Sequence, residues 1–272
     1  MDSTDDDTRR HLRGGFDLAA EDYLRTRPVC PSQLFDDLIQ VARLNAGDRV
    51  VEIGCGAGQA TVPLAERGLA ITAVELGAEL AAITRRRLSG FPAAEVVTCS
   101  FEEWQPPDVL LGAVDAVVAF NSLHWIDPQL RYARPYGLLR SGGAMAVAGC
   151  RRAQPKDAGR FWTDVQMDYR AVGYEGAPPP PPEQISPWRF PREAEKLIRE
   201  VASLLYPFEV LYSAEDYLAN LATQSGTRAL GEARSAEFLA RVRRRLESLG
   251  WPQLTVTLVG YLTVGQRISL VR

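Results

Sequence analysis

The sequence predicts an α/β protein with a doubly wound, mostly parallel sheet of seven strands and a helical lid inserted into it. Three observations support this prediction. Short apolar strands alternate with helix-length stretches through the first 150 residues, which is the pattern of a parallel sheet with right-handed crossovers. A glycine-rich turn follows the first strand, at 54–58. The alternation breaks near residue 151 and strand-like stretches return near 208.

The individual elements follow from local patterns. An amphipathic stretch over 16–28 stops at Pro28, and apolar spacing predicts a helix over 31–44. The wholly apolar core of RVVEIG (49–54) predicts a buried parallel strand. The other expected strands cover 70–76, 94–100, 113–121, 144–150, 208–213 and 254–267, and the other expected helices cover 59–68, 77–90, 128–143, 214–224 and 232–249.

Three regions are expected from these elements. Residues 1–30 form an N-terminal arm, residues 31–150 and 206–272 form the sheet domain, and residues 151–205 form an aromatic-rich lid. The lid contains five consecutive prolines at 178–182, which cannot enter a sheet interior and form a stiff extended spacer.

Composition excludes several classes of function. With 272 residues, of which 46% are hydrophobic, the chain can bury one sizeable core with an elaboration. The four cysteines are scattered without a CxxC pair, so we expect reduced thiols, a cytoplasmic protein and no metal site. The net charge of −3 and the lack of a long Lys/Arg block indicate no nucleic-acid partner. No apolar run approaches the ~20 residues that span a bilayer, so we expect no membrane association.

The stretch VVEIGCGAGQAT (50–61) is the most informative one. Gly54, Gly56 and Gly58 lie between a buried strand and a helix, where glycine permits positive φ and close approach of a ligand to the backbone. A tight strand–helix turn would also account for them. The third glycine comes one residue too early for the dinucleotide fingerprint G-x-G-x-x-G.

Two acids narrow the type of ligand. Glu75 ends the second predicted strand, where an acid can bind a ribose diol. Glu52 lies inside the strand just before the glycines. An acid at that place tolerates a cationic ligand better than a pyrophosphate.

The run EIGCGAG resembles motif I of the class I S-adenosylmethionine-dependent methyltransferases. The resemblance covers residues 31–150 and extends more loosely to the C-terminus through YLANLATQS (217–225) and the closing strand. That part is similar to small-molecule methyltransferases of the trans-aconitate methyltransferase type. The resemblance implies a Rossmann-like fold and S-adenosyl-L-methionine as the cofactor.

The resemblance also implies roles for the residues of the motif. Glu52 and the three glycines would line the methionine half of the cofactor, and Glu75 would hold the ribose hydroxyls. The family often has an acid near the adenine at the end of strand three. This chain has Ser100 there, followed by Phe101, so we expect adenine contacts from these two residues. Asn121, which ends the fourth strand, matches a position that often touches the cofactor.

The N-terminal arm carries a second resemblance. In EDYLRTRP (21–28), the Tyr-x3-Arg-Pro pattern is similar to the arm that folds over the active site in this subgroup. Arg27 would then pair with the cofactor carboxylate. A solvated arginine on a surface helix is the alternative interpretation.

The stretch FNSLHWID (120–127) contains His124, one of only two histidines in the chain. Ligands of a doubly wound sheet lie outside the carboxyl ends of the strands, and His124 follows the fourth predicted strand by three residues. One interpretation is a packing histidine that caps a backbone carbonyl. The other is a base that accepts a proton from the nucleophile, because an unperturbed pKa of about 6.5 suits a base at neutral pH.

The resemblance extends to one particular reaction. Bacterial indole C3-methyltransferases belong to the same subgroup, and they use a Tyr/His pair to remove the indole N–H as C3 attacks the methyl group. The matching residues here are Tyr23 and His124, which would be the catalytic pair. We expect the acceptor to contact Trp125 and the lid aromatics Trp162, Tyr169 and Trp188, because aromatic side chains at this density suit a flat apolar ligand. A small helical core would also explain the lid aromatics.

We therefore expect methyl transfer to a small-molecule acceptor of secondary metabolism, with an indole of a tryptophan derivative as the first candidate. O-methylation of a small carboxylic acid or a phenol is the alternative reaction. The carboxylic acid would need two or three convergent arginines, for which the candidates are Arg131, Arg134, Arg151 and Arg152. The alternative class is a non-catalytic protein that binds the cofactor and serves a partner. A homodimer is compatible with each of these.

Overall fold

The computed structural model describes residue 17 and residues 19–155, 159–174 and 177–268. These residues fall into two compact units. Unit 1 takes its residues from 1–28, 151–186 and 207–259, and unit 2 takes its residues from 29–150, 187–206 and 260–272. The described residues of 151–186 thus fall in unit 1, and 187–206 fall in unit 2 with most of the sheet.

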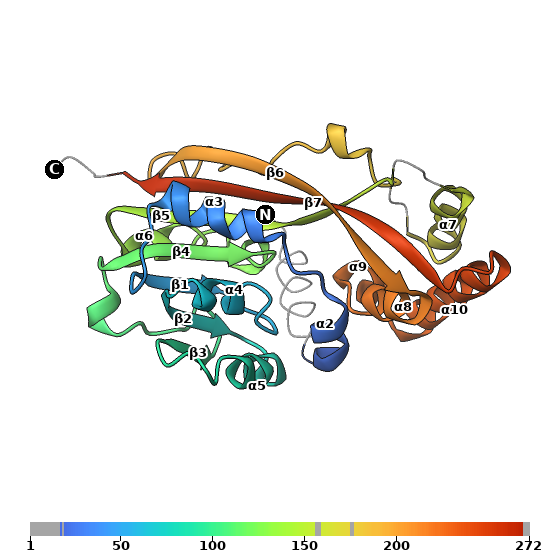
Figure 1. Ribbon diagram of the computed structural model, residues 1–272, viewed down its shortest axis with the longest axis horizontal. Helices are drawn as coiled ribbons and strands as arrows, with labels where there is room; N and C mark the ends of the chain where they lie inside the picture. The colour runs from blue at the N-terminus through green and yellow to red at the C-terminus, as the bar shows by residue number, and fades with distance from the viewer. Residues whose placement is uncertain (1–16, 18, 156–158, 175–176, 269–272) are drawn as a thin grey trace. The chain divides into compact units, whose positions relative to one another are not determined.

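The described strands form a seven-stranded sheet in the order β3-β2-β1-β4-β5-β7-β6 (Figure 1). The predicted doubly wound α/β fold is thereby confirmed. The strands are β1 (Arg49–Ile53), β2 (Ala70–Glu75), β3 (Ala94–Thr98), β4 (Val114–Phe120), β5 (Leu139–Ala153), β6 (Ile198–Ser213) and β7 (Gln253–Arg267). β1 pairs in parallel with both β2 and β4, β2 with β3, and β4 with β5. In Figure 1, β6 and β7 run in opposite directions.

The central strands are apolar because helices cover both faces of the sheet in unit 2. On one face, α3 (Ser32–Ala42) and α4 (Thr61–Glu66) pack on the sheet through Leu34, Phe35 and Leu64. On the other face, Leu138 of α6 (Ala133–Leu138) lies in a second cluster that contains Val51 and Val117 of the sheet. Alternate residues of one strand thus enter opposite cores, which is the pattern of a parallel sheet buried on both faces. α5 (Ala78–Arg87) connects β2 to β3.

The helix predicted over 128–143 was wrong at both ends. α6 covers only Ala133–Leu138, and β5 begins at the next residue. The glycines at its end do not stop a helix. Gly142 has φ +72°, and the pairing of β4 with β5 shifts register between Val114 and Ala116. A glycine in the left-handed region allows such an irregularity within a strand.

Unit 1 has its own hydrophobic core. It contains α2 (Ala20–Thr26), α7 (Arg160–Ala171), α8 (Ala214–Ala222), α9 (Ser225–Ala229) and α10 (Glu232–Ser248). Phe161, Tyr217 and Phe238 are fully buried at the centre of this core. α2 is held at its end, because the carbonyl of Thr26 accepts hydrogen bonds from the Tyr212 hydroxyl at 2.8 Å and from the Asn220 amide at 2.9 Å.

Within the described residues, no helix is long and apolar enough to cross a membrane.

Candidate cofactor and acceptor sites

The three glycines of the first turn all have left-handed backbones. The φ angles of Gly54, Gly56 and Gly58 are +66°, +57° and +81°. Residues other than glycine rarely adopt such values. A Cβ atom on Gly54 would lie 2.8 Å from the Cβ atom of Ser122. The positive φ angles favour glycine at all three positions, and the contact with Ser122 excludes a side chain at Gly54. The three glycines therefore present backbone without side chains at the carboxyl end of β1.

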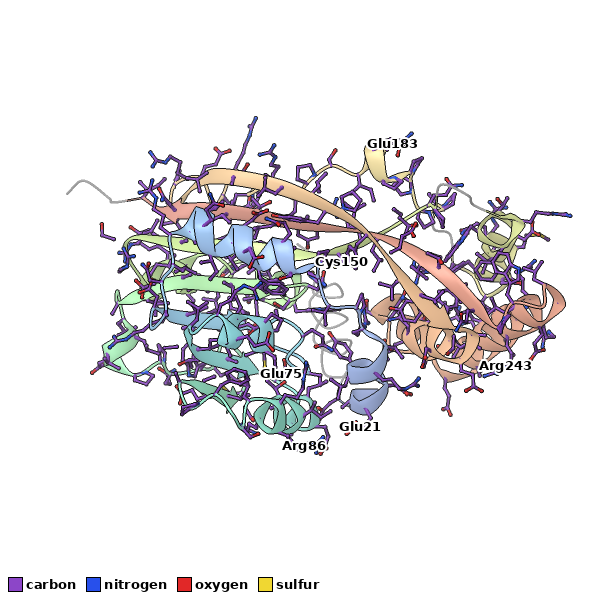
Figure 2. All side chains as sticks on the ribbon, in the orientation of Figure 1. Glu21, Glu75, Arg86, Cys150, Glu183 and Arg243 are labelled. Atoms are coloured by element: carbon purple, nitrogen blue, oxygen red, sulfur yellow. The ribbon has the colours of Figure 1, made fainter. Side chains whose placement is uncertain are left out.

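Glu75 lies at the end of β2 (Figure 2). One of its oxygens, Oε2, accepts the backbone N–H of Gly56 at 2.8 Å, and Oε1 accepts the N–H of Gly77 at 2.9 Å. These two bonds hold the carboxylate of Glu75 against the glycine turn. Two residues predicted to act together, Gly56 and Glu75, are thus in direct contact.

Glu52 is a buried carboxyl group inside β1. Its side chain is 1% exposed, and its Oε2 atom has no hydrogen-bond partner among the described residues. The pKa of Glu52 is raised to about 7, mainly because burial disfavours the charged form; the Thr61 hydroxyl opposes the shift and the negative charge of Glu75 adds to it. A cationic group placed beside this carboxyl would satisfy it, because the charge would offset the desolvation that keeps it protonated.

The expected adenine residues already have partners within the protein. Ser100 donates a hydrogen bond to Glu103 Oε2 at 2.8 Å and accepts one from the Glu103 N–H at 3.2 Å. Phe101 is buried and packs near Trp104, with ring centroids 6.1 Å apart. Both residues follow β3, as expected, and their contact with adenine stays a prediction.

Asn121 and Ser122 follow the carboxyl end of β4. Asn121 has φ +54°, and its side-chain oxygen accepts the backbone N–H of Cys150 at 3.1 Å. A non-glycine residue in the left-handed region is uncommon and is often found at functional sites. Sequence reasoning missed Ser122, which is buried, donates to the carbonyl of Ile53 and packs against Gly54. No sequence motif predicts this contact between the ends of β1 and β4.

His124 lies in a short 3-10 turn, η3 (Leu123–Trp125), beyond β4. Its ring is 4.7 Å from the Trp125 ring, measured between centroids, and its side chain reaches solvent. The protein packed around the imidazole lowers its pKa by partial desolvation, and the positive charge of Arg131 lowers it further. The ring is therefore neutral at pH 7 and able to accept a proton.

The arm residues Tyr23 and Arg27 belong to unit 1. Arg27 lies 4.9 Å from the centroid of the Tyr23 ring and donates to the carbonyl of Thr223 at 2.7 Å. Its Nε atom is buried without a hydrogen-bond partner among the residues that the structure describes. Arg27 is thus not simply a solvated surface charge. Since His124 belongs to unit 2, the Tyr23–His124 pair stays a prediction.

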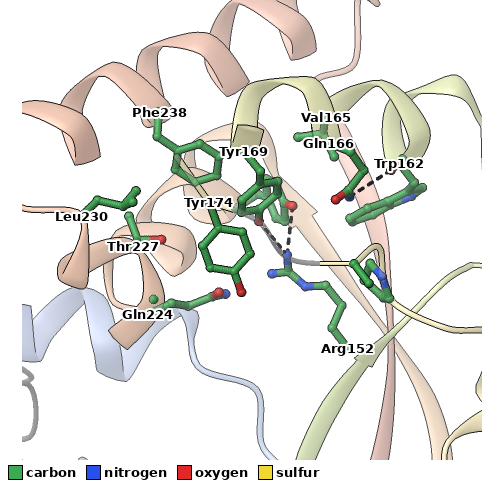
Figure 3. Close-up of a pocket in the computed structure, with 14 residues that line it drawn as sticks. Arg152, Trp162, Val165, Gln166, Tyr169, Tyr174, Gln224, Thr227, Leu230 and Phe238 are labelled. Carbon is green, nitrogen blue, oxygen red and sulfur yellow. Dashed lines mark hydrogen bonds between the residues drawn. The ribbon is translucent and has the colours of Figure 1, made fainter. Parts of the chain in front are cut away.

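The expected acceptor residues are also divided between the units. Trp162 and Tyr169 line a cavity in unit 1 (Figure 3). In unit 2, Trp188 packs edge-on against Phe190, with centroids 5.0 Å apart, and Trp125 lies beside His124. The lid aromatics therefore line a cavity in unit 1 and pack against the core of unit 2, and their contact with an acceptor stays a prediction.

The candidate arginines are divided between the two units. In unit 2, Arg131 donates to the carbonyl of Ile126 at 2.8 Å and Arg134 donates to the carbonyl of Trp104. In unit 1, Arg151 donates to the carbonyl of Ser186 at 3.1 Å, whereas Arg152 lines the cavity with Trp162. No group of three or more His, Cys, Asp or Glu side chains in the described ranges could hold a metal ion.

Comparison with known proteins agrees with this geometry. Residues 51–145 match a family described as "Methyltransferase domain". An uncharacterized methyltransferase of Mycobacterium bovis is 31% identical over 140 residues, which cover 52% of this chain and 54% of that protein. A trans-aconitate 2-methyltransferase of Paracidovorax citrulli is 32% identical over 126 residues, which cover 45% and 44%. The chain thus spans about half the length of the curated relatives it matches.

A solved structure shares the fold over most of the chain. It comes from Anaeromyxobacter dehalogenans and is provisionally described as a type II methyltransferase. The superposition has a TM-score of 0.59 at 22% identity and covers 88% of this chain and 97% of that one.

Residues 51–145 thus resemble a methyltransferase domain of the class I, S-adenosylmethionine-dependent type, and the sheet has a doubly wound fold. S-adenosylmethionine is the cofactor of that class, and the residues present fit it. The backbone at 54–58 admits close approach, the Glu75 carboxylate lies against this turn, and the Glu52 carboxyl lacks a partner on one oxygen among the described residues.

Proposed function

We propose that the protein transfers a methyl group from S-adenosylmethionine to a small-molecule acceptor. The observation that carries this proposal is the buried carboxyl of Glu52 beside the left-handed glycine turn, which is itself held by Glu75. A neutral or anionic ligand would leave Glu52 without compensation, whereas a sulfonium and an ammonium group offset its charge. The intact turn also argues against a non-catalytic relative that has lost its cofactor.

The cofactor supplies an electrophilic methyl group when it is bound. Glu52 and the glycine backbone would hold its methionine half, and Glu75 would hold its ribose. The remaining task of the protein is to align the acceptor, and alignment alone can contribute ~7–11 kcal/mol. No metal is needed for this, because the sulfonium is already a good leaving group.

His124 supports an acceptor that carries a proton. A carboxylate acceptor needs no base, whereas a phenol or an indole profits from one. The lowered pKa of His124 keeps the imidazole neutral at pH 7, and only the neutral form accepts a proton. Our specific proposal is C3-methylation of an indole in a tryptophan derivative. His124 would accept the proton released from the nucleophile, and the Tyr23 hydroxyl would orient it. O-methylation of a phenol uses the same base and is the second candidate.

Cofactor binding tests the first part of the proposal. Calorimetry should give micromolar or tighter binding of S-adenosylhomocysteine, with strong weakening by Gly56→Val and by Glu75→Ala. Tight binding of NAD with no binding of S-adenosylhomocysteine would refute the proposal. A panel of indoles, phenols and organic acids with labelled cofactor then identifies the acceptor class.

Kinetics of His124→Ala test the second part. We expect kcat to fall by roughly 10²- to 10⁴-fold, the usual contribution of a general base. Tyr23→Phe should cost less, because it keeps the ring and removes only the hydroxyl. Neither change should alter S-adenosylhomocysteine affinity. The wild-type rate should fall as the pH drops below 6.5 through the lowered pKa of His124, because the ring becomes protonated. Near-normal kcat with lower thermal stability would make His124 a packing residue.

A further inference from the structure

A cavity in unit 1 contains an arginine whose charge is not balanced by an acid. The cavity has a volume of about 210 Å³ and includes Arg152 at the unit 1 end of β5. Among the described lining residues, Arg152 is the only one with a full charge, and it makes no ion pair with any described acid within 4.0 Å. The acids nearest in sequence on α7 are otherwise occupied, since Asp164 and Asp168 both lie beside Arg245.

The partners of Arg152 are neutral hydroxyl groups. Its Nη1 atom lies 3.4 Å from the hydroxyls of both Tyr169 and Tyr217, and its guanidinium lies 5.5 Å from the centroid of the Tyr217 ring. Burial raises the pKa of both tyrosines, so neither hydroxyl ionises to balance the cation. These bonds are long for hydrogen bonds, and they leave the other guanidinium N–H groups for a ligand.

The walls of the cavity are flat and mostly apolar. Trp162 and Phe238 are buried aromatic walls, and Val165 and Leu230 add aliphatic surface. Figure 3 shows that Tyr174 and Gln224 extend toward Arg152 from the other wall of the cavity. Sites for small molecules combine such apolar walls with a few placed polar groups, and this volume is below the usual ~300–1,000 Å³. The cavity therefore suits a ligand of one or two rings.

We propose that unit 1 binds a small aromatic monocarboxylate in this cavity, with the ring between the aromatic walls and the carboxylate on Arg152. A planar guanidinium binds a carboxylate through two parallel N–H bonds. A di- or tricarboxylate would need further cations, which the described walls lack. The proposal concerns binding and does not depend on methyl transfer. That the bound acid is the methyl acceptor rests on the proposed function.

Binding of matched probes tests this proposal on the full chain without cofactor. Indole-3-acetate and its neutral analogue indole-3-acetamide differ only in the charged group. Calorimetry should show that the wild-type protein binds the acid tighter, by roughly 10-fold or more, as expected for hydrogen bonds between charged partners. Trans-aconitate should bind more weakly than indole-3-acetate.

Variants then assign the effect to Arg152. Arg152→Gln should remove the preference for the acid over the amide, and Arg152→Lys should keep part of it. Arg170→Gln is the matched control, because Arg170 follows Tyr169 on α7 and its side chain is exposed. It should keep the full preference.

Three results would overturn the proposal. They are equal affinity of the wild-type protein for acid and amide, no binding of either probe at millimolar concentration, and an acid preference that survives Arg152→Gln. The wild-type comparison decides the matter even if the variants do not fold. S-adenosylhomocysteine binding, measured in parallel, tests the proposed function separately.

Discussion

The two candidate binding sites of this chain are built from different parts of the polypeptide. In unit 2, the site at the ends of β1 and β2 consists mainly of backbone, namely the left-handed turn at 54–58 held by the carboxylate of Glu75. In unit 1, the cavity consists of residues from α7, α8, α9, α10, the end of β5 and the segments that follow α7, α8 and α9. A backbone site is set by conformation, so almost any side chain in the turn disturbs it. A side-chain cavity is set by which residues line it, so single substitutions change its ligand.

This difference predicts opposite responses to mutation. Changes in the unit 2 turn should abolish cofactor binding without changing what kind of ligand is preferred. Changes in the unit 1 cavity should alter ligand preference and leave cofactor binding intact. The predictions below are ordered by the expected effect on cofactor affinity.

Gly54→Ala should have the largest effect. Its Cβ atom would lie 2.8 Å from Ser122 Cβ on a backbone with φ +66°. Strain and overlap of this kind each cost about 1–3 kcal/mol, and the turn can relieve them only by moving. We expect S-adenosylhomocysteine affinity to fall by roughly 30-fold or more, measured by calorimetry.

Gly112→Ala is the matched control for the glycine turn. Gly112 has φ +64°, and a Cβ atom there meets nothing within 4 Å. It carries similar backbone strain away from the turn, so it should lower stability slightly and leave cofactor affinity unchanged. Equal loss of affinity in both variants would show that the effect is general destabilisation, and the backbone account of the unit 2 site would fail.

Glu52 should make cofactor affinity depend on pH. Its carboxyl has a pKa of about 7 in the folded protein, and only the ionised form offsets a cationic ligand. Affinity for S-adenosylmethionine should therefore weaken as the pH falls below 7, by roughly tenfold per unit, and binding should release protons near neutral pH. Calorimetry in two buffers of different ionisation enthalpy measures the released protons. Binding without proton release at pH 6 to 7 would contradict this role.

Glu52→Gln should separate stability from binding. The pKa of Glu52 is raised from 4.5 to about 7 by folding. An acid whose pKa is raised by folding favours the folded state only in its protonated form. Its contribution to stability is fully present below the unfolded pKa and is lost as the pH rises through the folded pKa. At pH 8, Glu52→Gln should thus raise the free energy of unfolding by an amount on the order of 1–3 kcal/mol, with little change at pH 5. Cofactor affinity should fall by roughly tenfold at pH 8. A variant that is less stable at pH 8 would mean that the carboxylate is stabilised by the apo fold.

The same difference explains what the sequence could predict. Local signals determine the unit 2 site, because the glycines, Glu52 and Glu75 lie within 24 residues, each inside or directly after a recognisable strand. The unit 1 cavity has no local signal. Arg152, Tyr169 and Tyr217 meet only through the fold, and each is unremarkable in its own stretch of sequence.

Element boundaries show the same limit. The strand alternation over 49–121 predicted β1 to β4 to within two residues at each end. β5 and β6 start earlier than predicted, at Leu139 and Ile198, because pairing in the sheet extends them through stretches without a strand pattern. Ser122 likewise depends on the distance between two strand ends, which no single stretch encodes.

Asp168→Asn should have the smallest effect on cofactor affinity, and it tests whether the two regions are separable. Asp168 binds Arg245 of α10 through two hydrogen bonds, at 2.5 and 3.1 Å, and its side chain is only 8% exposed. Asparagine leaves one weaker bond, so the free energy of unfolding should fall by about 1–3 kcal/mol. Glu237→Gln on the same helix breaks the exposed pair with Arg241 and should cost less than about 0.5 kcal/mol. Thermal melts should resolve this difference, while S-adenosylhomocysteine affinity at 25 °C stays at the wild-type value in both variants. β5, β6 and β7 run through both units. A large loss of cofactor affinity in Asp168→Asn alone would therefore show that the core of unit 1 supports the cofactor turn. The separation of a backbone site from a side-chain site would then no longer hold.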